Sequence, residues 1–353
     1  MPMRVLATAL FIGCFLLLVS AFRQPENNDP LFTFYENLSG YGFFTGALNN
    51  LQPAADVLPY DLNTPLFSNY AEKARFIRLP SGKKAVYHET GLFQLPVGTV
   101  LIKNFYYPLD FRQPEKGRRI LETRLLAHRE SGWATYQYIW NAEQTDAVFE
   151  PVGDIVSVLF TDAHGKNVQF RYVIPSQAQC LGCHKTSNRI QPIGMAARHL
   201  NGDYAYATGT KNQLQYWKEQ GWIDLPEGPH PSNAAWDREA SGTVEQRARA
   251  YLDINCGHCH SKEGPARTSG LFLDIHETNP TALGILKTPV AAGRGSGNRS
   301  YDIEPGKPER SILVYRMHTN DPGIAMPEIG RELVHKEGVA LISRWIKEMH
   351  MQP

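Results

Sequence analysis

The first half of the chain, from about Pro30 to Ile174, contains short stretches of mainly hydrophobic and aromatic residues with polar segments between them. Stretches rich in β-branched and aromatic residues, separated by Pro, Gly, Asn and Asp, are typical of β-strands. The clearest are TVLIKNFYY (99–107), RILETRLLAH (119–128), WATYQYIW (133–140), IVSVLF (155–160) and VQFRYVI (168–174). The last two flank DAHGKN, which predicts a hairpin loop. We expect an antiparallel sandwich or a curved sheet.

The pattern changes after Pro175. Pro, Gln, Asn and Gly become more frequent, and only short helical stretches remain, at 194–200 and 213–220. The segment LPEGPHPSNAAW then predicts a domain boundary near residue 235. We therefore expect a β-rich domain at 30–235, whose last segment has little regular structure.

Helical periodicity dominates the last third, at 236–353. Thr243 and Gln246 form a Thr-x-x-Gln capping box, which predicts the start of a helix. A second amphipathic helix near the end of the chain has apolar residues on one face, namely Val339, Ile342, Trp345 or Ile346, and Met349. The expected fold class is α+β, with a β-rich, sandwich-like domain followed by a helical one.

The N-terminus has the pattern of an export signal. Arg4 precedes an apolar run from Val5 to Phe22, and a polar segment follows. The small residues at Val19-Ser-Ala21 favour cleavage after Ala21, so 1–21 is expected to be removed. The run is also about as long as the shortest membrane-spanning helices, so an uncleaved anchor is the alternative. Either way, we expect a periplasmic protein.

Charge and composition exclude some partners. The chain has 36 Lys and Arg against 35 Asp and Glu, and its hydrophobic fraction of 42% is ordinary for a globular protein. A balance so close to zero gives no electrostatic footprint for nucleic acid or anionic lipid.

Cysteine spacing carries the candidate chemistry. Of five cysteines, Cys14 lies in the signal, and the others form Cys180-Leu-Gly-Cys183-His184 and Cys256-Gly-His-Cys259-His260. A Cys-x-x-Cys-His motif supplies two thiols for thioether bonds to haem and an adjacent imidazole for its iron. Two such motifs behind an export signal predict two haem c groups, with His184 and His260 as proximal ligands.

Other interpretations of these residues remain open. Two Cys-x-x-Cys pairs are also typical of a four-cysteine zinc site, which would leave the histidines at 184 and 260 unexplained and would not need export. A thioredoxin-like dithiol would require a βαβ context, which the pattern lacks.

The sixth ligand of each iron determines whether a haem transfers electrons or binds small molecules. For the second haem, Met326 in DPGIAMPE is the candidate, because it lies in a loop between the motif and the last helix; Met317 and His318 are alternatives. For the first haem the candidates are Met195 and His199 in PIGMAARHL, and a vacant or water-bound site is also open.

Two arginines and one histidine near the motifs are weaker candidates. Arg294 and Arg299, around GRGSGN, are candidates for propionate contacts, with solvated loop cations as the alternative. We expect His258 to face solvent. No residue is assigned a catalytic role.

The motifs, together with NTPLFSNYAEKARFIRLP, IPSQAQCLGCH, PIGMAARHLN and CGHCHSKEGPARTSGLFLDI, resemble a family of largely uncharacterised bacterial dihaem c-type cytochromes over nearly the whole mature chain. The last third also resembles an all-α class I cytochrome c domain. This resemblance implies a haem between the first and last helices, with His260 proximal, Met326 distal and the Pro265 carbonyl orienting the imidazole. The β-rich region is weakly similar to cytochrome P460-like domains, in which a lysine modifies the haem; Lys103 lies in the similar segment.

The expected function is exported one-electron transfer to or from an unidentified redox protein. The alternative is a haem enzyme, an oxidase or peroxidase for small molecules, that acts at an open first haem and uses the C-terminal domain as its electron conduit.

Overall fold

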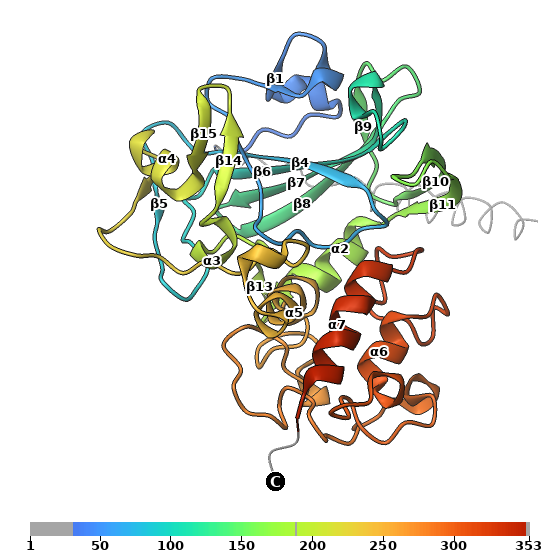
Figure 1. Cartoon of the computed structure of the whole chain (residues 1–353). Coiled ribbons are helices and arrows are strands. Elements are labelled where there is room, and N and C mark those ends of the chain that lie inside the picture. The colour runs from blue at the N-terminus through green and yellow to red at the C-terminus, as the bar shows by residue number, and fades with distance from the viewer. Residues whose placement is uncertain (1–30, 188, 351–353) are drawn as a thin grey trace, which may run out of the picture. The chain divides into compact units, whose positions relative to one another are not determined.

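The computed structural model describes residues 31–187 and 189–350 (Figure 1). The expected signal at 1–21 lies outside the described residues, so export, cleavage and anchoring stay predictions. In the described ranges, no helix combines the length and the hydropathy needed to cross a bilayer. From Tyr35 onward the chain forms one compact unit. The boundary near residue 235 stays a prediction.

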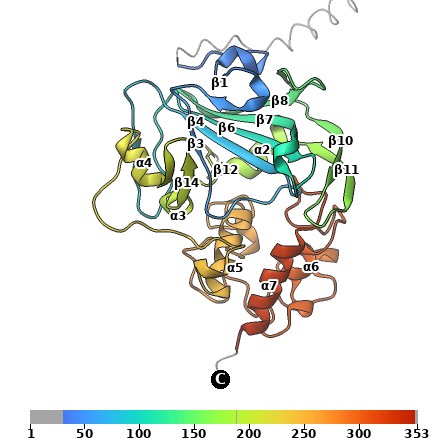
Figure 2. The ribbon, with the colours of Figure 1, turned by 45° about the horizontal axis from the view of Figure 1, so that its top comes forward.

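A six-stranded antiparallel sheet forms the centre of this unit (Figures 1 and 2). In spatial order its strands are β3 (Leu58–Tyr60), β4 (Glu72–Arg78), β6 (Val100–Pro108), β7 (Arg118–Arg129), β8 (Gly132–Trp140) and β9 (Ala147–Phe149). The stretches rich in β-branched and aromatic residues predicted β6, β7 and β8 to within two residues at each end, because such residues favour strands.

Five smaller strand pairs surround the sheet. They are β1 (Phe44–Thr45) with β2 (Gln52–Pro53), β10 (Asp154–Thr161) with β11 (Asn167–Ile174), β12 (Lys185–Thr186) with β13 (Arg189–Ile190), β14 (Asp203–Tyr206) with β15 (Gly209–Asn212), and β5 (Ala85–Val86) with β16 (Ile223–Asp224). The predicted hairpin around DAHGKN is confirmed as β10–β11. Strands of two residues are too short to produce a period in the sequence.

Six α-helices occur in the described residues: α2 (Gln177–His184), α3 (Ala197–Leu200), α4 (Gln213–Glu219), α5 (Val244–Leu252), α6 (Ile312–Met317) and α7 (Lys336–Glu348). A π-helical turn, η5 (Asp253–Gly257), continues α5. Short 3-10 turns are η1 (Leu38–Tyr41), η2 (Leu48–Asn50), η3 (Pro114–Lys116), η4 (Glu239–Ser241), η6 (Arg267–Ser269), η7 (Gly293–Ser296) and η8 (Pro308–Arg310).

The expected all-α domain at 236–353 is wrong. In the described part of this range, up to residue 350, only α5, α6 and α7 are α-helices, and the long stretch between η5 and α6 consists of loops and 3-10 turns. Proline and glycine recur through this stretch, as in GPARTSG, GRGSGN and PGKP, and both residues disfavour helix interiors. The chain is mostly β-sheet with few short helices; the β-rich part of the expected fold is consistent with the structure.

Among the described residues, three apolar clusters hold the elements together. One lies on a face of the sheet, where Ile77, Leu101 and Leu126 pack with residues of α3 and α4. The second lies farther along the sheet, where Phe105 and other residues pack against the hairpin β10–β11. The third joins α5, α6 and α7. Helix α2 lies between the sheet and these C-terminal helices (Figure 1).

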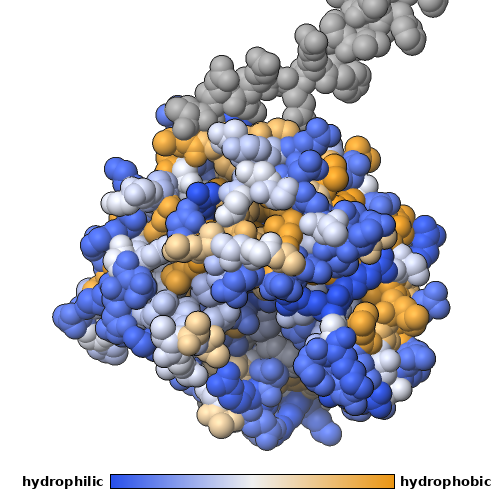
Figure 3. All heavy atoms as spheres, turned by 90° about the horizontal axis from the view of Figure 1, so that it is seen from above, coloured by the Kyte–Doolittle hydropathy of each residue, from blue (hydrophilic) through white to orange (hydrophobic). Residues whose placement is uncertain are grey.

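The outer surface is mixed. On the face seen in Figure 3, apolar residues form separate patches between hydrophilic ones. Scattered exposed apolar side chains are normal for folded proteins.

Candidate functional site

The first Cys-x-x-Cys-His motif lies on α2. Ser176 caps this helix: its Oγ accepts a hydrogen bond from the Gln179 amide (3.3 Å), and Gln179 Oε1 accepts one from the Ser176 amide (2.8 Å). This Ser-x-x-Gln box is visible in the sequence and would have predicted the helix. Because α2 spans the whole motif, Cys180, Cys183 and His184 follow one another along a single helix.

Strand β8 anchors this helix to the sheet. Gln177 Nε2 donates a hydrogen bond to the Thr135 carbonyl (2.6 Å), and Gln137 Nε2 donates one to the Pro175 carbonyl. The position of the first motif therefore follows from the register of the sheet.

The second motif begins in η5, directly after α5. The predicted capping box is confirmed, since Thr243 Oγ1 accepts from the Gln246 amide (3.2 Å) and Gln246 Oε1 accepts from the Thr243 amide (2.9 Å). Beyond the motif the chain turns back closely: a Cβ at Gly264 would lie 2.2 Å from the Cys259 carbonyl oxygen. Glycine is therefore required at that position.

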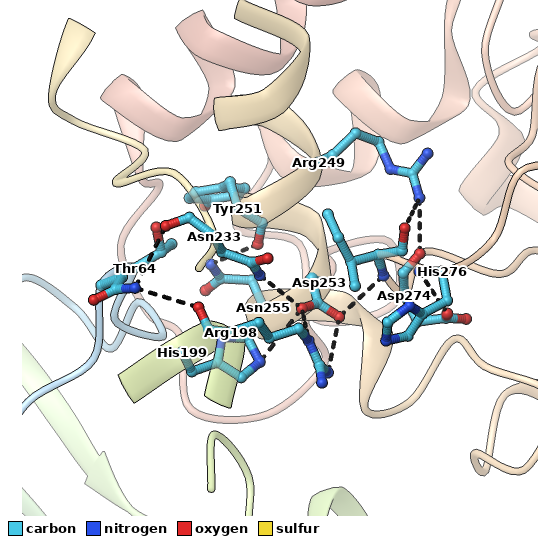
Figure 4. A network of polar contacts seen from close by, with 12 residues as sticks. Thr64, Arg198, His199, Asn233, Arg249, Tyr251, Asp253, Asn255, Asp274 and His276 are labelled. Carbon is cyan, nitrogen blue, oxygen red and sulfur yellow. Dashed lines mark hydrogen bonds and ion pairs between the residues drawn. The ribbon is translucent and has the colours of Figure 1, made fainter. Parts of the chain in front are cut away.

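A buried carboxylate at the start of η5 connects this motif to the rest of the molecule (Figure 4). Asp253 accepts from Arg198 Nε (2.8 Å), Asn233 Nδ2 (3.0 Å) and the Ile275 amide (3.1 Å), and His199 Nε2 lies 3.3 Å from it. Burial by itself raises the pKa of Asp253, but His199 and Arg198 lower it overall. Asp253 is thus held as a carboxylate just ahead of Cys256.

The fold brings the two motifs into contact. The Sγ atoms of Cys183 and Cys259 and a ring nitrogen of His258 all lie within 4.8 Å of one another. The four cysteines of the motifs are free thiols. His258, which the sequence predicted to face solvent, is only partly exposed, and its Nδ1 is buried without a hydrogen-bond partner. The sequence did not predict this contact of His258 with the two cysteines, because the spacing within one motif carries no information on the position of the other.

The two facing thiols share a proton unequally. A hydrogen bond from Cys259 is the main cause that lowers the pKa of Cys183 to about 4, and His258 adds to this effect. The same hydrogen bond raises the pKa of Cys259. Burial raises the pKa of Cys256 to about 12 and also raises that of Cys180. The contact between the two thiols therefore favours a thiolate at one of them.

Each proximal histidine is oriented by a backbone carbonyl. His184 Nδ1 lies 2.8 Å from the Gln191 oxygen, and His260 Nδ1 lies 3.3 Å from the Leu271 oxygen. A carbonyl accepts only, so Nδ1 carries the proton and Nε2 is left as a ligand atom. Burial lowers the pKa of both imidazoles to about 4, which keeps them neutral.

The carbonyl expected to orient the second imidazole was assigned to the wrong residue. The oxygen that accepts from His260 belongs to Leu271 and not to Pro265. The chain turns closely at Gly264, and the carbonyl that lies next to the His260 ring comes later in the chain, at Leu271.

A cavity of about 180 Å³ adjoins both motifs, lined by residues that include Cys183, His184, His258, Arg198 and His199. It is smaller than the 300–1,000 Å³ usual for sites of organic ligands. The donor set fits a haem, with free thiols and neutral imidazoles whose Nε2 is available. Room for a macrocycle requires the side chains around the cavity to move apart.

The three candidate sixth ligands lie in different surroundings. Met195 is fully buried in the apolar cluster on the sheet. His199 lines the cavity with His184, and its buried Nδ1 has no hydrogen-bond partner. Met326 is partly exposed, and its amide donates to the Arg316 carbonyl (3.0 Å).

The Met326 loop reaches both motifs. Glu328 contributes to the raised pKa of Cys259, and Ile329 Cδ1 lies 4.0 Å from where a Cβ on Gly182 would be. Met317, one alternative, is buried against the C-terminal helices.

The remaining predicted residues have partners of their own. Arg294 forms an exposed ion pair with Asp321 (2.8 Å). Arg299 stacks 4.1 Å from the Tyr315 ring centroid and donates to the Glu309 carbonyl. Their contacts with propionates stay predictions.

Comparison with known proteins adds no relative. No family model, no curated protein and no solved structure matches this chain. The resemblance to a dihaem cytochrome family, to class I cytochrome c and to P460-like domains is therefore unsupported. The mostly β-sheet fold without an all-α C-terminal domain contradicts it.

Proposed function

We propose that the chain binds two haem c groups, one on each Cys-x-x-Cys-His motif, and transfers single electrons to or from a redox protein. One observation carries this proposal. In both motifs two free thiols accompany an imidazole whose Nδ1 donates to a carbonyl, which leaves Nε2 available for iron.

When bound, haem supplies an iron that changes oxidation state by one electron. The chain's own residues would bind and orient it. Cys180 and Cys183, like their counterparts in the second motif, supply the thioether sulfurs. The Gln191 and Leu271 carbonyls hold the two proximal rings in one tautomer. Direct contact between the motifs supports electron exchange between the two sites.

For the sixth ligands we propose His199 at the first haem and Met326 at the second. His199 is preferred to Met195 because its Nδ1 is buried without a partner, whereas Met195 packs fully in an apolar cluster. His199 Nε2 lies 3.3 Å from the Asp253 carboxylate, so we propose Nδ1 as the ligand atom.

The test is the haem content of the exported protein. We expect a haem stain on a denaturing gel and a mass increased by two haems. Cys180→Ser with Cys183→Ser should remove one haem, and Cys256→Ser with Cys259→Ser the other. Absence of covalent haem in the unaltered protein would overturn the proposal.

A second candidate rests on the cluster of Cys183, His258 and Cys259. Thiolate and imidazole ligands at this separation suit a zinc ion. A thioether sulfur cannot also serve as a thiolate, so zinc and covalent haem exclude each other here. Stoichiometric zinc, lost on His258→Ala, together with a negative haem stain would establish this candidate.

The enzyme alternative depends on an open iron. If His199 and Met326 are the sixth ligands, the reduced protein should not bind carbon monoxide. Binding by the unaltered protein at one iron would favour the oxidase or peroxidase alternative, and His199→Ala should create such binding at the first haem.

A further inference from the structure

Three cations lie side by side across the central sheet. Arg75 on β4 pairs with Lys103 on β6, and Lys103 pairs with Arg124 on β7. Lys73 lies two residues from Arg75 on the same strand and therefore on the same face. Like charges directly opposite each other destabilise a sheet, so this cationic row needs compensation.

The cationic row faces the first motif. Arg124 is the charged group with the largest effect on the pKa of Cys180, and Lys103 acts on the pKa of His184. Along the same face, the row has an apolar cluster on either side, with Leu101 in one and Phe105 in the other. It thus forms a polar strip beside α2.

Acidic neighbours compensate only part of this charge. Glu122 pairs with Arg124 through two hydrogen bonds (2.6 and 2.8 Å), and Asp61 pairs with Arg75 Nη1. Arg75 Nη2 is buried without a hydrogen-bond partner. In the described parts of the chain, no carboxylate lies within ion-pair distance of Lys73 or Lys103.

The pKa values of the lysines show the same imbalance. Burial is the main cause that lowers the pKa of Lys73 to about 7, and Arg75 lowers it further. Burial, then Arg75 and Arg124, also lowers the pKa of Lys103. Glu72, Asp61 and Glu122 oppose these effects without cancelling them.

An anion has access to this row. Lys73 and Lys103 are partly exposed, and the Arg124 side chain keeps 27% of its surface accessible. Arg75 is 4% exposed and its Nη2 is a buried donor without a partner, so an anion bound by the lysines reaches it once neighbouring side chains shift. A guanidinium with a free N–H beside an ammonium is typical of sites that bind carboxylates and phosphates.

We propose that the cationic row of Lys73, Arg75, Lys103 and Arg124 binds an oxyanion, with Arg75 Nη2 and the Lys103 ammonium as its principal donors. Two sources share this chemistry. One is a free inorganic oxyanion. The other, which rests on the proposed function, is a propionate of the haem attached to α2.

The experiment uses full-length exported protein of measured haem content. Phosphate is titrated at constant ionic strength, and Tm is recorded, with chloride as the comparison salt. Lys103→Met removes one donor from a partly exposed position, and Lys103→Arg restores the charge. Lys166→Met, at an exposed position in the β10–β11 loop, is the matched control.

For a free oxyanion, we expect phosphate to raise Tm in the unaltered protein and in Lys166→Met. Lys103→Met should bind phosphate about ten- to a hundredfold more weakly, as for the loss of one charge-assisted hydrogen bond. If the anion is a propionate, phosphate should not change the Tm of the haem-loaded protein. Lys103→Met should then lower the midpoint potential of one haem, because a positive charge near it is lost, and Lys103→Arg should restore the potential.

If Lys103→Met matches Lys166→Met in both phosphate response and midpoint potential, the site is overturned. Should the stain show that no haem is attached, the proposed function fails, and the phosphate titration alone then supports or rejects the site. The two failures are therefore distinguishable.

Discussion

The two motifs have the same residues but are positioned by different forces. The first lies on a capped helix that side-chain amides tie to β8 of the six-stranded sheet, so many backbone contacts of the sheet share in holding it. The second lies in a π-helical turn behind one buried carboxylate, Asp253, which accepts hydrogen bonds from three other segments. We infer that the first motif tolerates single substitutions better, whereas the second depends on a single charge.

The largest expected effect is that of Asp253→Ala. Its carboxylate is 2% accessible, and its loss leaves Arg198, whose side chain is only 16% accessible, without its counter-charge. Breaking a buried pair in this way costs about 3–5 kcal/mol. Chemical denaturation should show this loss of unfolding free energy. Haem content should fall more at the second motif than at the first. Glu245→Gln, at an exposed position on α5, is the control. A loss no larger than the control's would show that the second motif does not depend on this charge.

The next effect separates packing from ligation at the two methionines. Met195→Ala empties space in a closed apolar cluster, so we expect a loss of about 2–5 kcal/mol with no change in the near-infrared sulfur-to-iron band. Met326→Ala should abolish that band with a smaller loss of stability, because Met326 is partly exposed. If Met195→Ala abolished the band and Met326→Ala did not, Met195 would be the ligand and Met326 would not.

Part of the acid sensitivity should come from His335, which packs against α5 just ahead of the second motif. His335 stacks on Phe67 with ring centroids 4.1 Å apart, and its Nδ1 lies 2.9 Å from the Tyr251 hydroxyl. Burial lowers its pKa to about 4, against about 6.5 in the unfolded chain. Below pH ~6.5 the unfolded state therefore binds a proton that the folded state does not.

The stability contributed by neutral His335 is thus complete above pH ~6.5 and is lost as pH falls towards the folded pKa, by up to about 3 kcal/mol. His335→Gln should reduce the slope of unfolding free energy against pH in this window. His164→Gln, at an exposed position, should leave the slope unchanged. An unchanged slope in His335→Gln would show that other groups cause the acid sensitivity.

The smallest expected effect compares the two helix caps. Ser176→Ala and Thr243→Ala each remove a capping-box hydroxyl, at a cost of about 0.5–2 kcal/mol. Because β8 also anchors α2, we expect haem attachment at the first motif to survive Ser176→Ala. Quantitative haem staining of both variants measures this. Loss of the first haem alone would show that the cap, and not the sheet, positions α2.

Local patterns explain which elements could be predicted. The strands β6, β7 and β8 are rich in β-branched and aromatic residues, and α5 has a capping box, so the local sequence defines both. The prediction of an all-α domain was wrong because it was based on two helices, α5 and α7, and the region between them was assumed to be helical as well. The Pro- and Gly-rich segment between them contained the contrary information.

The site shows the same division. The sequence alone determined the residue types of both motifs and the strand-forming stretches of the sheet, because bonded neighbours and local composition specify them. Tertiary structure alone placed Cys183 beside Cys259, chose the Leu271 carbonyl for His260, and aligned Arg75, Lys103 and Arg124 across three strands. These contacts join residues far apart in the chain, and they depend on strand register and on the packing of whole elements, for which spacing within a motif carries no information.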